Sequence, residues 1–126
     1  MIYGIGTDIV KVPRVNKSLT RYGHKFAQKI LSDSEYSRFE THASPAHFLA
    51  KRFAAKEAAA KALGTGFRNG LYLKHIVVVS DDQGKPSLVL THYAKTLCEK
   101  LGIGEMFLSL SDEDDYAIAY VILMKK

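Results

Sequence analysis

The sequence predicts an α+β fold in which a small antiparallel sheet packs against one long buried helix. Short apolar runs between turn residues read as strands, and the last two of them can pair as a hairpin. An alanine-rich segment in the middle of the chain has helical spacing and no wide polar side. The length of 126 residues fits one domain with a substantial core, so residues 1–126 are expected to form a single domain.

The first strand is expected over residues 1–10. One of its faces carries alternate residues, namely Ile2, Gly4, Gly6, Asp8 and Val10. Asp8 interrupts an apolar run, where a carboxylate is costly unless a cation faces it. Asp8 therefore either caps the next helix or holds a metal. Gly4 and Gly6 allow another backbone or a ligand to come close.

Residues 13–31 follow as a helical segment that Gly23 divides in two. Six Lys or Arg residues and no acidic residue lie between Ile9 and Ser32, and the rest of the chain carries 12 basic and 13 acidic residues. The net charge of +5 therefore resides here. A basic stripe repeats every three or four residues and consists of Arg14, Lys17, Arg21, Lys25 and Lys29. It is either a solvated face or a docking surface for an acidic protein helix or nucleic acid.

A short helix over 35–41 precedes the central helix, which is expected over 45–63. Ser44 is a good N-cap, Pro45 suits the first helical position, and Gly64 suits the left-handed stop. Eight of the eighteen residues from 46 to 63 are Ala. Because this helix lacks a polar side, it should be buried, and its charged side chains then need partners. The simplest such partnership is an ion pair between Glu57 and Lys61, one turn apart.

In the second half of the chain the sequence predicts a turn-rich loop over 64–70 and then strands over 76–80 and 87–90. A helix over 91–101 and strands over 106–111 and 116–124 are expected to follow. The acidic turn at 112–115 is either a solvated hairpin tip or a cation site. Cys98 is the single cysteine, which fits a reducing compartment. Neither a signal peptide nor a membrane-length apolar run is visible, so we expect a cytoplasmic protein without a membrane partner.

Asp8 on a strand and Glu57 on a helix suit a hard divalent cation. Mg²⁺ typically takes one or two carboxylates together with waters and substrate phosphates. The cationic residues around Glu57 are typical partners of phosphate oxygens, and they are Arg52, Lys56 and Lys61. Zinc-ligand spacing, the Walker A loop and the full dinucleotide glycine pattern are all missing. A metal-assisted phosphate site is thus a hypothesis that spacing alone does not decide.

Several stretches carry a resemblance to a known family: Gly-Ile-Gly-Thr-Asp-Ile-Val at 4–10, Arg-Phe-Ala-Ala-Lys-Glu-Ala-Ala-Ala-Lys-Ala at 52–62, Gly-Thr-Gly at 64–66, Gly-Lys-Pro at 84–86, and the closing 109–111 and 116–119. Together they resemble the holo-acyl-carrier-protein synthases, the small bacterial 4′-phosphopantetheinyl transferases, nearly from end to end. The resemblance implies the phosphopantetheinyl transferase fold and a homotrimer with active sites between subunits. An alanine-rich helix that needs more burial than one small chain supplies fits such a trimer.

The implied reaction moves 4′-phosphopantetheine from coenzyme A to a serine of apo acyl carrier protein, releases adenosine 3′,5′-bisphosphate, and serves fatty acid biosynthesis. By this resemblance Asp8 and Glu57 hold Mg²⁺ on the pyrophosphate, and Lys61 stabilises the leaving phosphate. Either Glu57 or a metal-bound water takes the serine proton. The implied coenzyme A pocket consists of Arg52, Lys61, Gly64, Thr65, Gly66, Lys85, Pro86 and Ser109.

The resemblance also gives the basic stripe an acidic partner, the carrier protein, docked through Arg14, Arg21, Lys25 and Phe26. One position departs from the family pattern, because Asp112 stands where many members have a phosphate-facing His. An ionised carboxylate is no phosphate donor, so that role is not carried over to this chain.

The alternative to an enzyme is a basic, non-catalytic module that binds protein or nucleic acid. A nucleic-acid module would explain the basic stripe, but it leaves Asp8 and Glu57 without a purpose, and no aromatic stacking platform is evident. We therefore expect no nucleic-acid partner. A protein-binding module would tolerate Asp8→Ala without loss of function.

Overall fold

The structure, a computed structural model, describes residues 1–126. Its elements are β1 (Ile2–Lys11), α1 (Val12–Tyr22), α2 (His24–Ile30), α3 (Asp33–Glu40), α4 (Pro45–Leu63), the 3₁₀ turn η1 (Leu73–His75), β2 (Ile76–Ser80), β3 (Pro86–Leu90), α5 (His92–Leu101), β4 (Ile103–Asp112) and β5 (Tyr116–Lys125). The predicted α+β class and the order of helices and strands are confirmed. The turn η1 was not predicted, and β4 begins three residues earlier than the apolar pattern indicates.

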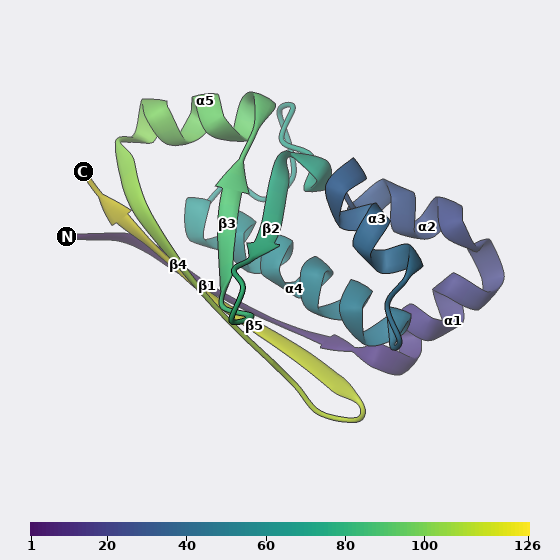
Figure 1. Cartoon of the computed structure of the whole chain (residues 1–126). Coiled ribbons are helices and arrows are strands. Elements are labelled where there is room, and N and C mark those ends of the chain that lie inside the picture. The colour runs from purple at the N-terminus through teal and green to yellow at the C-terminus, as the bar shows by residue number, and fades with distance from the viewer.

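The strands form a three-stranded antiparallel sheet in the order β1–β5–β4 and a separate β2–β3 hairpin. Helix α4 lies across the inner face of the sheet, with the β2–β3 hairpin on its far side (Figure 1). Helices α1, α2 and α3 gather at one end of the molecule, and the two chain termini lie together at the other (Figure 1). None of the helices has both the length and the apolar character needed to cross a bilayer.

Helix α4 is buried inside the chain itself. Twelve of its nineteen residues are buried, although the sequence led us to expect that one small chain supplies too little burial. That expectation is wrong, because the sheet, the hairpin and the helices α1 and α3 all contact α4. The burial of this helix therefore gives no support for an oligomer.

Strand β1 approaches α4 backbone to backbone. A side chain at Gly6 would collide with the Ala58 carbonyl oxygen, and one at Gly4 would collide with the Ala62 carbonyl oxygen. The two glycines therefore make room for a helix and not for a ligand, which decides the alternative that the sequence left open.

The ends of α4 agree only in part with the prediction. Pro45 occupies the first turn and Gly64 ends the helix at φ 83°, in the left-handed region. Ser44 occupies the N-cap position, but its side chain makes no capping hydrogen bond, because its φ and ψ of −126° and 76° differ from a capping conformation. Its backbone N–H instead donates to His42 Nδ1 at 3.0 Å.

The outer face of the sheet is apolar and uncovered. Side chains alternate across a strand, so the inner face takes Gly6, Asp8 and the buried alanines while the outer face takes their neighbours. The exposed outer residues include Ile5, Ile9, Phe107, Ile118 and Tyr120. The strand register pairs Ile9 with Ile118, which makes this apolar surface continuous across strands.

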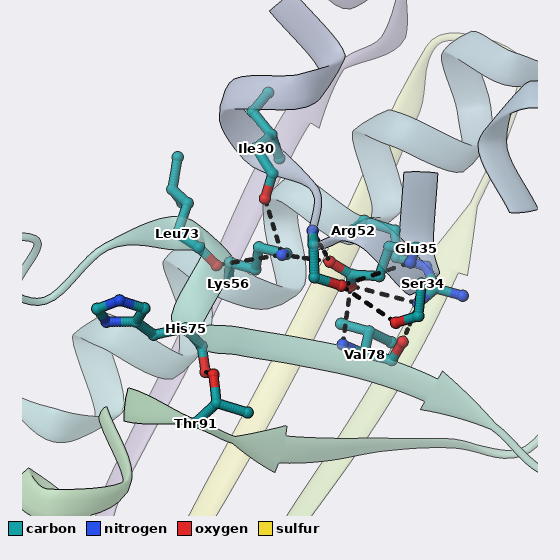
Figure 2. A network of polar contacts seen from close by, with 10 residues as sticks. Ile30, Ser34, Glu35, Arg52, Lys56, Leu73, His75, Val78 and Thr91 are labelled. Atoms are coloured by element: carbon teal, nitrogen blue, oxygen red, sulfur yellow. Dashed lines mark hydrogen bonds and ion pairs between the residues drawn. The ribbon is translucent and has the colours of Figure 1, made fainter. Parts of the chain in front are cut away.

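A buried cluster of Glu35, Arg52 and Lys56 ties α3, α4 and β2 together (Figure 2). Lys56 Nζ donates to Glu35 Oε1 at 2.6 Å and to the carbonyl oxygens of Ile30 and Leu73 at 2.8 and 3.1 Å. Lys56 has no solvent-exposed surface, so these three acceptors replace water for its ammonium group. Burial lowers the pKa of Lys56, and the nearby Glu35 charge opposes that shift.

Both oxygens of Glu35 are occupied. Oε1 also accepts the Ser32 N–H at 2.9 Å, which completes a capping box at the start of α3. Oε2 accepts the Val78 N–H at 2.8 Å and Arg52 Nη1 at 3.4 Å. Arg52 also donates to the Val78 carbonyl oxygen, and its guanidinium lies 4.6 Å from the Phe48 ring centroid. The sequence indicated that the charges of α4 need partners, and Glu35 is that partner.

We expect Glu35→Ala to lower the free energy of unfolding by about 3–5 kcal/mol, because it leaves a buried ammonium and a buried guanidinium without their anion. Urea denaturation would measure the loss. Glu99→Ala is the matched control, since Glu99 is exposed on α5 and is expected to change stability by less than about 0.5 kcal/mol. Equal stability of the two variants would contradict the role given to Glu35.

Candidate functional site

Asp8 and Glu57 meet where β1 crosses α4. Asp8 lies on the inner face of β1, and Lys61 Nζ donates to Asp8 Oδ1 at 3.1 Å and to the Thr7 carbonyl oxygen at 3.0 Å. Asp8 does not cap α1, whose N-cap is Lys11. Of the two roles left open for Asp8, capping is therefore excluded.

Glu57 is half-buried beside Asp8 and makes neither a hydrogen bond nor an ion pair within the chain. The simple pair between Glu57 and Lys61 is therefore absent, because Lys61 turns to Asp8. Burial raises the pKa of the Glu57 carboxyl above its ordinary value, the Asp8 charge raises this pKa further, and Lys61 lowers it. Two carboxylates that repel each other, one of them without a partner, make a site that attracts a cation.

These residues fit the pattern of ligands that Mg²⁺ accepts. No group of three or more His, Cys, Asp or Glu side chains is placed to bind a metal, so a metal here would have the two carboxylates as its protein ligands. Magnesium commonly completes such a pair with waters and substrate phosphate oxygens. Asp8 and Glu57 are the residues that would hold it.

Two cavities meet at Glu57. The first has a volume of about 470 Å³, and its lining includes Asp8, Arg14, Phe26 and Tyr116. The second has a volume of about 860 Å³ and lies between α2 and the loop that joins α4 to η1, with Lys25, Lys29, Arg68, Tyr72 and Lys74 in its lining. The partnerless carboxylate thus lies where two open depressions meet, and the lining of the second one is strongly basic.

The structure places three of the four predicted docking residues at these cavities. Arg14 and Phe26 line the first cavity together with Asp8, and Lys25 lines the second. Arg21 lines neither cavity, and its guanidinium lies 5.2 Å from the Tyr22 ring centroid. All five cations of the basic stripe are exposed.

The predicted coenzyme A residues do not come together in one chain. Gly64, Thr65 and Gly66 come just after the C-terminal end of α4, in the turn after Lys61, which pairs with Asp8. Arg52 and Pro86 instead line a third cavity of about 250 Å³ that reaches β4, at the opposite edge of the sheet from β1.

Lys85 is exposed in the turn beside this third cavity. Ser109 lies on the outer face of β4, opposite Tyr120 in the register. The separation of these residues from Asp8 and Glu57 is a tertiary feature that spacing along the sequence does not reveal.

Asp112, the position that departs from the family pattern, also lines the third cavity. Its Oδ1 lies 3.6 Å from Lys51 Nζ. The acidic turn that follows is an exposed hairpin tip, where His47 Nε2 lies 3.3 and 3.2 Å from the carbonyl oxygens of Glu113 and Asp114. Sequence reasoning did not single out Lys51, Arg68 or Lys74, because only the tertiary fold brings these cations to cavities.

Residues 4–121 match the family described as the 4′-phosphopantetheinyl transferase superfamily. The holo-[acyl-carrier-protein] synthase of Salmonella heidelberg is 52% identical over 122 residues, which cover 97% of each chain. The crystal structure of holo-[acyl-carrier-protein] synthase from Neisseria meningitidis superposes with a TM-score of 0.94 and 42% identity, over 99% of this chain and 100% of that one.

A holo-(acyl-carrier-protein) synthase from Bacillus anthracis, solved in complex with CoA (3′,5′-ADP), gives a TM-score of 0.83 and 34% identity over 100% of this chain and 99% of that one. Sequence and structure thus agree on one family over nearly the whole chain.

We expect Lys61→Met to raise the pKa of Glu57 further in the metal-free protein, because the Lys61 ammonium favours the ionised carboxylate. Titration of ¹³C-labelled glutamate carboxyls by NMR in the presence of EDTA would measure the shift. Lys51→Met removes an equal charge from the same helix next to Asp112 and should leave Glu57 unchanged. A Glu57 pKa that stays constant or falls in Lys61→Met would contradict this account.

Proposed function

The chain belongs to the 4′-phosphopantetheinyl transferase superfamily, and on that premise we propose that it is a Mg²⁺-dependent holo-acyl-carrier-protein synthase of fatty acid biosynthesis. It transfers the 4′-phosphopantetheine group of coenzyme A to a serine of apo acyl carrier protein and leaves adenosine 3′,5′-bisphosphate. The observation that carries the proposal is the meeting of Asp8 and Lys61 with the partnerless Glu57, which lines two cavities, one of them strongly basic. The buried, free Cys98 fits the reducing cytoplasm proposed as its compartment.

The residues of the site have distinct roles in this reaction. Bound Mg²⁺ would neutralise pyrophosphate charge between Asp8 and Glu57. The serine oxygen attacks the phosphorus that carries pantetheine, the bond from this phosphorus to the bridging oxygen breaks, and Glu57 accepts the serine proton. Lys61 supplies positive charge to the departing phosphate.

We propose a homotrimer whose active sites lie between subunits. Two observations support it: the uncovered apolar outer face of the sheet, and the division of the coenzyme A residues between opposite sides of the chain. In such an assembly the cavity that contains Arg52 and Pro86 on one subunit would face Asp8 and Glu57 on the next. Ser109, on the outer face, would then lie at the contact between copies.

Intact mass spectrometry tests the reaction. Incubation with apo acyl carrier protein, coenzyme A and Mg²⁺ should raise the carrier mass by one phosphopantetheine. The rise should disappear with EDTA and with Glu57→Ala, because each removes part of the proposed metal site. Glu99→Ala on α5 should retain full transfer. Transfer that survives EDTA would overturn the metal requirement, and no transfer by the wild type would overturn the activity.

Ile118→Lys should convert the trimer to monomers and abolish transfer, because it puts a charge on the central strand of the apolar outer face. Size-exclusion chromatography with light scattering would report the mass in solution. Val89→Lys is the control, since Val89 is a similarly exposed strand residue on the separate hairpin and should leave the trimer intact. A wild type that is monomeric and active would refute the shared site.

A further inference from the structure

The larger cavity beside Glu57 has a basic lining that comes only in part from the basic stripe. Lys25 and Lys29 reach it from α2, whereas Arg68 and Lys74 come from the loop between α4 and β2. All four cations are exposed, and none of the ion pairs within the chain involves them. Glu57 is the single acidic residue in the lining. The cavity therefore concentrates unneutralised positive charge at the candidate site.

The loop that carries Arg68 and Lys74 is anchored to the core. Asn69 and Gly70 turn the chain with φ of 58° and 94°, and Leu71 is almost completely buried. The Leu73 carbonyl oxygen accepts from Lys56 Nζ at 3.1 Å, which joins the loop to the Glu35 cluster (Figure 2). Between these anchors Tyr72 remains 65% exposed. The two cations and an exposed aromatic ring are thus presented from a fixed position.

This lining suits an acidic polypeptide better than coenzyme A. In the proposed function the pyrophosphate lies at Asp8, Glu57 and Lys61, and the pantetheine arm carries no charge. In the same proposal the adenosine end with its 3′-phosphate lies toward the Arg52 and Pro86 cavity of the neighbouring subunit. Four cations spread around a depression of about 860 Å³, with Tyr72 and Phe67 beside them, match a protein segment that combines acidic side chains with an apolar anchor. Lys25 also belongs to the basic stripe, so the two basic surfaces are continuous.

We propose that the acyl carrier protein docks on both sides of Glu57, with a second acidic segment of the same partner held by Arg68, Lys74 and Tyr72. This inference rests on the proposed function and extends its docking surface from α1 and α2 to the loop between α4 and β2. Contacts on two sides of the reactive carboxylate fix the orientation of the partner, and they thereby direct its serine to Glu57. Arg68 and Lys74 are docking residues in this arrangement and take no part in the chemistry.

The test compares Arg68→Ala/Lys74→Ala with Lys95→Ala/Lys100→Ala, a control that removes the same charge from the exposed face of α5. Fluorescence anisotropy of labelled apo carrier protein gives Kd without any turnover, and transfer kinetics give KM and kcat. We expect the loop variant to raise the carrier Kd and KM about three- to tenfold at low salt, with a weaker salt dependence. The KM for coenzyme A and the kcat should stay within about twofold, and the control should match the wild type.

Three results would overturn the inference. A raised KM for coenzyme A with unchanged carrier binding would assign the cations to coenzyme A phosphates. Unchanged constants for both substrates, or equal losses in the α5 control, would remove the docking role. Because Kd is measured without catalysis, a wild type that binds the carrier but does not transfer would count against the proposed function alone. Thermal melting verifies that the variants remain folded, and Arg68→Lys/Lys74→Arg should restore binding.

Discussion

The contact between β1 and α4 determines where the candidate site lies. Because Gly6 meets Ala58 and Gly4 meets Ala62, the strand lies closer to the helix than any side chain would permit. Asp8 follows Gly6 by two residues and therefore points to the same inner face. Glu57 and Lys61 directly precede the two alanines, so the same contact brings them to the edge of the strand. The close packing of these two glycines and two alanines therefore fixes where Asp8, Glu57 and Lys61 lie relative to one another.

The neighbouring charges of α4 have opposite roles. Lys56 has no exposed surface and is bonded to Glu35, whereas Glu57, the next residue, is partly exposed and has no partner. Successive residues on a helix differ by about 100° in direction, which turns Lys56 to the core and Glu57 to the cavities. A buried ion pair needs nearly complete hydrogen bonding to be tolerated, and Glu35 achieves this through donors from three elements. The reactive carboxylate lies next to the most constrained charge in the protein.

Local signals in the sequence predicted the elements well. Gly23 divides the basic segment and Gly64 ends the central helix, because glycine at a left-handed position is a local property. The pairing of Asp8 with Glu57 was a hypothesis from their chemistry that only the family resemblance decided, since no local rule joins residues so distant in sequence. Glu35 was missed because its partners lie 17 and 21 residues away, on a helix whose orientation only the fold determines. Ser44 has the right chemistry for a cap, but its backbone conformation prevents the bond.

The packing of α4 between the sheet and the β2–β3 hairpin also bears on how this protein can diverge. Inserting or deleting one residue before Lys56 would rotate every later side chain by about 100°. An insertion would turn the buried lysine toward the cavities, and a deletion would turn the reactive glutamate into the core. Sequence length in this helix is therefore under selection from its core face and its site face at once. The loop that carries Arg68 and Lys74 is not constrained by a core face and a site face at once. Relatives can therefore acquire new partner preferences there while their chemistry stays the same.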